Sequence, residues 1–80
     1  MTPEQCRAAR GWLNWTQADL ATRAGTALST VKDFEGGRRV PISNNLAAMK
    51  AALESGGIAF FDDDKSSGLT VEKQGVKDKG

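Results

Sequence analysis

Apolar side chains recur along the chain with the spacing of helices that each bury one face. Residues 2–14 and residues 43–56 both carry apolar side chains at positions i, i+3 and i+7, which share one stripe of a helix. The two stripes consist of Cys6, Ala9 and Leu13 and of Leu46, Met49 and Leu53. The pattern therefore predicts a longer helix at each end of this region, with its stripe turned toward a core.

Two shorter helices are predicted between these two. The first begins after Thr16, because a threonine with an acidic residue three positions later satisfies the free amides of a first turn. It ends at Gly25, since glycine adopts the left-handed conformation of a helix cap. The next helix follows after two or three residues, runs from Leu28 to Glu35 and stops at a pair of glycines. A tight turn therefore joins the two helices.

Polar caps are expected at the start of both longer helices. Thr2 caps the first one, with Pro3 at the first helical position and Gln5 three residues past the cap. Ser43 caps the last one, which closes at Gly56.

Beyond residue 56 the helical spacing gives way to short apolar runs. Residues 58–61 and 69–71 are predicted to form two strands, and residues 62–68 the turn between them. From about residue 74 the chain has almost no apolar content, and the tail 74–80 is expected to be disordered. The resulting fold class is mainly α, with four helices followed by a short C-terminal β-hairpin or extended tail.

The length of 80 residues suits one domain and lies near the lower limit for folding alone, which favours a homodimer. Residues 1–56 are expected to form the helical domain and residues 57–73 a C-terminal β segment. A two-stranded hairpin is only marginally stable by itself. Ile58 and Phe60 are expected to point to one side of the first strand and Phe61 to the other. These side chains are therefore expected to cover the helices on one side and a second subunit on the other, and all three are assigned to dimerisation.

Composition argues against an enzyme and against a metal site. The chain has no histidine and a single cysteine, so it lacks the commonest general base, and one thiol does not make a zinc site. No nucleophile–base pair can be assembled, and no cofactor is expected. No apolar run approaches the roughly 18 residues that span a bilayer, and no signal sequence opens the chain. The sequence therefore predicts a cytoplasmic protein with no membrane partner.

Net charge says little about partners. The chain carries a formal charge of +1, a weak electrostatic footprint for a nucleic-acid binder. Residues 1–41 carry a net charge of +2 and residues 42–80 one of −1, which is a small asymmetry.

Two short helices joined by a tight turn between longer helices have the layout of a helix-turn-helix. The positions that carry a closer resemblance are Arg10, Trp15 to Ala21, Ala24, Gly25, Ser29, Thr30, Val31, Phe34, Glu35, Gly37 and Pro41. Over roughly residues 5–55 the chain resembles the lambda-repressor/Cro-like family, also called the XRE family. The resemblance implies a lambda-repressor-like domain and a transcriptional regulator, most simply a repressor. Such a protein binds a palindromic operator in double-stranded DNA as a dimer, with half-sites ~34 Å apart.

The outward side of the third helix is the expected base-reading face. A rotation of 100° per residue turns this side away from the core once Val31 and Phe34 point inward. The resemblance assigns base contacts to Leu28, Ser29, Lys32 and Asp33. A lysine donates to guanine, an aspartate accepts from cytosine and a leucine packs on a thymine methyl.

Contacts to the DNA backbone are expected around that face. Gln17 opens the second helix, whose N-terminal amides suit a phosphate, and the resemblance assigns it a DNA contact. Thr30 adds a hydroxyl contact to the backbone. Arg38 and Arg39 follow the third helix and are placed to neutralise phosphates, although solubility alone would also explain two arginines in a loop.

An ion pair is expected between Arg10 and Glu35. The side chain of Glu35 lies on the inward side of the third helix, and a buried carboxylate needs a partner. The resemblance assigns that partner to Arg10, at the end of the first helix.

The chain departs from the family pattern at two places. Thr26 and Ala27 follow the turn glycine, where the family has an apolar residue and then serine or threonine. The third helix therefore lacks its usual cap unless Thr26 supplies it. Gly36 stands where the family often has asparagine, which removes one possible phosphate contact.

A second function stays open. An antitoxin or anti-activator would use the same fold chiefly to bind another protein, and many antitoxins of this fold also bind DNA. The near-neutral charge and the aromatic residues near the C-terminus favour such a protein-interaction module. The basic loop and Gln17 favour DNA.

Overall fold

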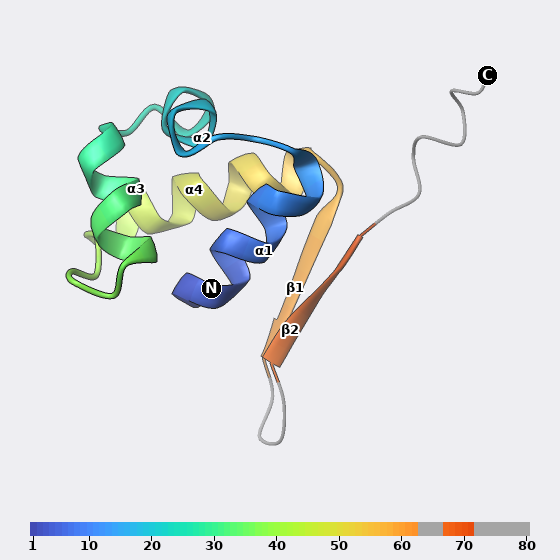
Figure 1. The fold of residues 1–80 in the computed structure, drawn as a ribbon. Helices are drawn as coiled ribbons and strands as arrows, with labels where there is room; N and C mark the ends of the chain where they lie inside the picture. The colour runs from blue at the N-terminus through green and yellow to red at the C-terminus, as the bar shows by residue number, and fades with distance from the viewer. Residues whose placement is uncertain (63–66, 72–80) are drawn as a thin grey trace.

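The computed structural model describes residues 1–62 and 67–71, which form four helices and one two-stranded antiparallel sheet (Figure 1). The elements are α1 (Pro3–Leu13), α2 (Gln17–Ala24), α3 (Leu28–Glu35), α4 (Ser43–Ser55), β1 (Ile58–Asp62) and β2 (Ser67–Val71). The predicted mainly α fold is therefore confirmed at this level, whereas the tail 74–80 lies outside the described residues. No helix in the described part of the chain has the length and apolar character needed to cross a membrane.

Helices α1 and α2 begin with the predicted polar caps. The hydroxyl of Thr2 accepts a hydrogen bond from the amide of Gln5, whose side chain accepts one from the amide of Thr2. Thr16 and Asp19 make the same reciprocal pair of bonds, each 2.9 Å long. Gly25 ends α2 with a φ of 71°, in the left-handed region that favours glycine. The local sequence thus accounts for both helix starts and for the turn after α2.

Helices α3 and α4 begin without a side-chain cap. The residue before α3 is Ala27, and the hydroxyl of Thr26 is buried with no hydrogen-bond partner among the described residues. The predicted cap at Ser43 is wrong, because Ser43 is already helical and Ile42 occupies the cap position in an extended conformation. Proline favours an extended residue before it and has a fixed φ itself. Helix α4 therefore begins at Ser43, directly after Pro41 and Ile42.

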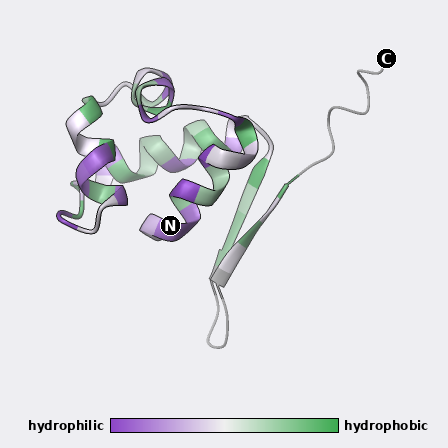
Figure 2. Cartoon of the chain, viewed as in Figure 1, coloured by the Kyte–Doolittle hydropathy of each residue, from purple (hydrophilic) through white to green (hydrophobic). Residues whose placement is uncertain are grey.

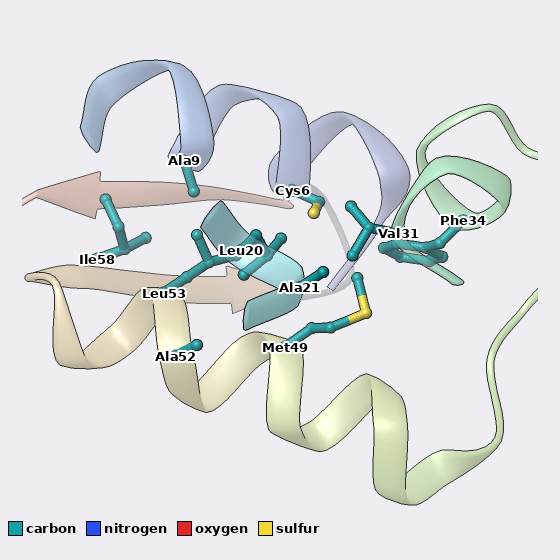
Figure 3. Close-up of a cluster of buried hydrophobic side chains, with 10 residues drawn as sticks. All are labelled: Cys6, Ala9, Leu20, Ala21, Val31, Phe34, Met49, Ala52, Leu53 and Ile58. Carbon is teal, nitrogen blue, oxygen red and sulfur yellow. The ribbon is translucent and has the colours of Figure 1, made fainter. Parts of the chain in front are cut away.

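The core lies between the four helices and one face of the hairpin (Figure 3). Its buried apolar residues are Cys6, Ala9, Leu20, Ala21, Val31, Phe34, Met49, Ala52, Leu53 and Ile58. All four helices and β1 contribute to this list, and Leu69 and Val71 of β2 pack against it. The two described strands therefore share the core of the helices rather than forming a separate unit.

The hairpin alternates as predicted. Ile58 is 3% exposed, Phe60 packs against the core and Phe61 on the opposite face is 45% exposed. The strands are longer than expected, because Asp62 pairs with Ser67 across the ladder instead of lying in the turn. Backbone hydrogen bonding extends the ladder to Asp62 and Ser67, although residues of these two types do not favour strands.

The side chain of Gln5 joins the hairpin to α1. Its Nε2 donates to the carbonyl oxygens of Phe61 and Gly68, at 3.2 and 2.6 Å. Gln5 is 6% exposed, so these bonds also satisfy a buried amide. The hairpin is thus tied to the helices by polar as well as apolar contacts.

Candidate nucleic-acid interface

Helix α3 is anchored by its inward side and by the turn that precedes it. Val31 and Phe34 are 0% and 3% exposed in the core. The amide of Thr26 donates to the carbonyl of Ala21 at 2.9 Å, which closes the turn between α2 and α3. In Figure 1, α2 is viewed nearly along its axis and α3 from its side, so the two helices cross steeply.

The outward side of α3 is available for contact. Ser29 and Lys32 are exposed, and Leu28 in the first turn is 39% exposed. Thr30 and Asp33 are half-buried. Figure 2 shows that hydrophilic residues gather on α3 and on the loop that follows it. The geometry therefore leaves three of the four predicted base-reading residues on one open surface.

Asp33 is paired within the protein, which the sequence reasoning missed. Its Oδ1 accepts from Nε of Arg38 at 3.2 Å, and Nη2 of Arg38 donates to the carbonyl of Lys32 at 3.2 Å. The structure therefore joins a predicted base contact to a predicted phosphate contact. The sequence does contain a signal for this contact, namely a basic residue just past the end of a helix. Such residues form hydrogen bonds with the last carbonyls of the helix.

Arg39 lies on the side of α3 that faces the start of α4. It borders a pocket of about 230 Å³ together with Ser29, Thr30 and Asn45. The loop between α3 and α4 thus brings Arg39 and Thr30 to the same edge of α3.

Arg10 and Glu35 form the ion pair expected from the sequence. Nε and Nη2 of Arg10 each donate to one carboxylate oxygen of Glu35 at 2.8 Å. The Glu35 side chain is 3% exposed and that of Arg10 19%. A third nitrogen of Arg10 donates to the carbonyl of Trp15 at 2.9 Å, so this one side chain joins α1, the turn before α2 and the end of α3.

Glu35 has further donors that the sequence reasoning missed. Nε2 of Gln17 donates to Oε1 at 3.0 Å, and the thiol of Cys6 donates to Oε2 at 3.1 Å. Arg7 donates to the backbone carbonyl of Glu35. No local spacing rule connects residues that lie 18 to 29 positions apart. The carboxylate is therefore a junction of three helices.

Hydrogen bonds keep the Glu35 carboxylate ionised. Burial by itself raises the pKa of Glu35, but the bonds from Arg10, Gln17 and Cys6 outweigh it and hold the pKa below its usual value. Burial, together with the bond to Glu35, raises the pKa of the Cys6 thiol. The thiol therefore stays protonated as a donor, and the carboxylate stays charged.

Gln17 borders a hollow between the start of α2 and the end of α3. The hollow has a volume of about 360 Å³ and is also lined by Arg7, Lys32 and Arg38. Only one amide hydrogen of Gln17 is needed for its bond to Glu35, which leaves a second hydrogen and the amide oxygen for another partner. Residues expected to contact DNA from separate helices thus meet at one place.

The three residues expected to serve dimerisation do not lie on one surface. Ile58 is buried in the core of its own chain, and Phe60 packs against that core. Only Phe61 lies on the outer face of the hairpin, since alternate side chains of a strand point to opposite faces. The assignment of Ile58 and Phe60 to an intersubunit surface is therefore corrected.

Neither a protein-family model nor a curated protein matches the sequence. The arrangement of α2, α3 and the polar groups around them is thus the ground for a functional inference.

Proposed function

We infer that this protein is a sequence-specific DNA-binding transcriptional regulator in which α2 and α3 form a helix-turn-helix. One observation carries the inference. Helix α3 is fixed to the core by Val31 and Phe34 and to α1 and α2 through Glu35, while its opposite side is open and polar. A helix held in this way presents its side chains to the major groove with little loss of conformational entropy on binding.

The open side of α3 supplies the base contacts. Ser29 and Lys32 reach base edges, and Leu28 packs on a thymine methyl from the first turn of the helix. Lys32 donates to guanine. Specificity therefore depends mainly on residues 28–32 of α3, whose N-terminal end enters the groove.

Polar groups on either side of α3 fix its register on the duplex. Gln17 and Arg38 contact the backbone from the side of α2, and Thr30 and Arg39 contact it from the side of α4. Contacts to phosphates orient the protein but carry no sequence information.

The protein acts as a dimeric repressor on a palindromic site. Two-fold symmetry of the protein requires half-sites ~34 Å apart, about one turn of the duplex. The outer face of the hairpin, with Phe61 exposed, provides the surface for the second subunit.

The proposal can be tested in two steps. Duplexes that bind the protein are first selected from a random library, and their affinity is then measured by fluorescence anisotropy at about 50 and about 200 mM salt. The selected duplex should bind in the presence of scrambled competitor, and the preference should be lost in Ser29→Ala and Lys32→Ala. Lys50→Ala on α4 removes the same charge away from α3 and should retain the preference. Weak binding without sequence preference at both salts would refute the proposal.

A second function, that of a protein-binding module such as an antitoxin, is favoured by the exposed apolar side chains. Phe61 is 45% exposed, and Val40 and Ile42 next to α4 are 76% and 70% exposed. A stoichiometric complex with another protein, lost in Phe61→Ser and kept in Lys32→Ala, would support this function over DNA binding.

A further inference from the structure

Arg38 belongs to the loop after α3, yet its side chain folds back over the helix. Nε lies 3.2 Å from Oδ1 of Asp33, and Nη2 lies 3.2 Å from the carbonyl oxygen of Lys32. The backbone amide of Arg38 donates to the carbonyl of Asp33 at 2.9 Å. Three bonds therefore hold this residue against the last turn of α3, although its side chain is 63% exposed.

Gly36 makes this position of the guanidinium possible. A Cβ at residue 36 would lie 2.5 Å from Nη1 and 3.0 Å from Cζ of Arg38. The backbone does not require glycine here, because φ is −85° and ψ is −1°, which any residue adopts. Glycine therefore matters at this position because it has no side chain, and not because its backbone is free to adopt unusual angles.

The guanidinium held over Gly36 borders the hollow next to Gln17. Among the described residues, four cationic side chains and one carboxylate line this hollow. The carboxylate, Glu35, is already bonded to Arg10 through both oxygens. The donors of Gln17, Lys32 and Arg38 therefore face a space with excess positive charge.

We propose that this hollow receives a phosphate of the DNA backbone, and that Gly36 and Asp33 are positioning residues that hold the Arg38 guanidinium beside it. A guanidinium fixed in direction donates two parallel bonds to a phosphate, which a mobile side chain achieves only after losing entropy. In this arrangement Asp33 acts through Arg38 and reads no base. The inference rests on the proposed DNA-binding function.

A double-mutant cycle tests the role of Gly36 in the full chain. Gly36→Ala places a methyl group where the guanidinium lies. The other close atom is the Lys32 carbonyl oxygen at 3.2 Å, which has to move by a few tenths of an ångström, so circular dichroism of the variant checks that the fold is kept. Gly36→Ala and Arg38→Ala should each weaken binding to the selected duplex about fivefold at ~0.15 M salt. Each should also lower the slope of log K against log salt by about 1 per bound protomer.

The double variant Gly36→Ala/Arg38→Ala should bind no more weakly than Arg38→Ala alone. Gly11→Ala is the matched control and should bind like the wild type, because Gly11 is an exposed helical glycine whose added methyl group would have no atom within 4 Å. An effect of Gly36→Ala that persists without Arg38 would overturn the inference. Wild-type protein that binds no duplex would overturn the proposed function as well, so the two failures are distinguishable.

Two further readouts test Asp33. The Nε–H signal of Arg38 in NMR spectra of the free protein should be protected from exchange in the wild type, and the protection should be lost in Asp33→Ala and Gly36→Ala. Asp33→Ala should leave the base preference unchanged at every position of the selected site. Loss of preference at one base pair would show that Asp33 reads that base, and equal exchange in all three proteins would refute the positioning role.

Discussion

The guanidinium of Arg10 meets the carboxylate of Glu35 through two nitrogen–oxygen distances of 2.8 Å, which joins the C-terminal part of α1 to the last residue of α3. The pair is largely removed from water, and Gln17 brings the first residue of α2 to the same carboxylate. Helices α1, α2 and α3 are therefore held together at one charged point, on which the position of α3 in the candidate interface depends.

Removal of Arg10 should destabilise the fold strongly. Arg10→Met keeps much of the apolar stem but leaves the buried carboxylate without its main partner, which costs about 3 kcal/mol or more in the free energy of unfolding. Urea denaturation measures the loss. Arg38→Met is the control, because its pair with Asp33 is exposed and contributes less than about 1 kcal/mol. Equal losses in the two variants would contradict a buried role for Arg10.

Stability should fall in acid because of Glu35. Its pKa is held below the ordinary value of 4.5, so the stability that it contributes is complete above about pH 4.5 and is lost as the pH falls through the depressed pKa. The difference in unfolding free energy between the wild type and Glu35→Gln should therefore be constant near neutral pH and shrink in acid. Urea titrations of both proteins over that range measure it. A difference independent of pH would contradict the assignment.

A serine at the start of α3 should stabilise the protein. Ala27 occupies the cap position with an extended backbone and no side-chain bond, and it is exposed. Ala27→Ser supplies an acceptor for a free amide of the first turn, which is worth about 1 kcal/mol. Ala51→Ser, at an exposed position inside α4, should instead cost about 0.5 kcal/mol. If the cap is absent in solution, thermal unfolding should show a higher melting temperature for Ala27→Ser and a lower one for Ala51→Ser than for the wild type.

Substitution of Phe61 should separate the subunits without unfolding them. Phe61→Ser removes the exposed aromatic side chain from the outer face of the hairpin, so sedimentation should change from dimer to monomer while the helical circular dichroism is kept. Phe60→Ala, on the inner face, should instead lower the stability by about 2 kcal/mol. Wild-type protein that sediments as a monomer at tens of micromolar would refute dimerisation through this face.

Local rules predicted the elements whose contacts are local. The reciprocal bonds of Thr2 with Gln5 and of Thr16 with Asp19 span three residues, so the sequence by itself determined where α1 and α2 begin. The alternation of Phe60 and Phe61 likewise follows from the geometry of a strand. The start of α4 was misplaced by one residue, because the cap depends on how the chain leaves Pro41.

Tertiary structure decided the contacts between residues far apart in the chain. The bonds of Cys6, Arg10 and Gln17 to one carboxylate need three helices to pack before the donors meet, and no spacing along the sequence encodes this. Resemblance to a family suggested the Arg10 partner alone. The side chain of Arg38 packs against α3 because Gly36 has no side chain in its place. The sequence does not show this relationship, because the two residues meet in this way only after the loop has folded back. The sequence therefore determined the helices and their inward faces, whereas packing determined which polar groups converge beside them.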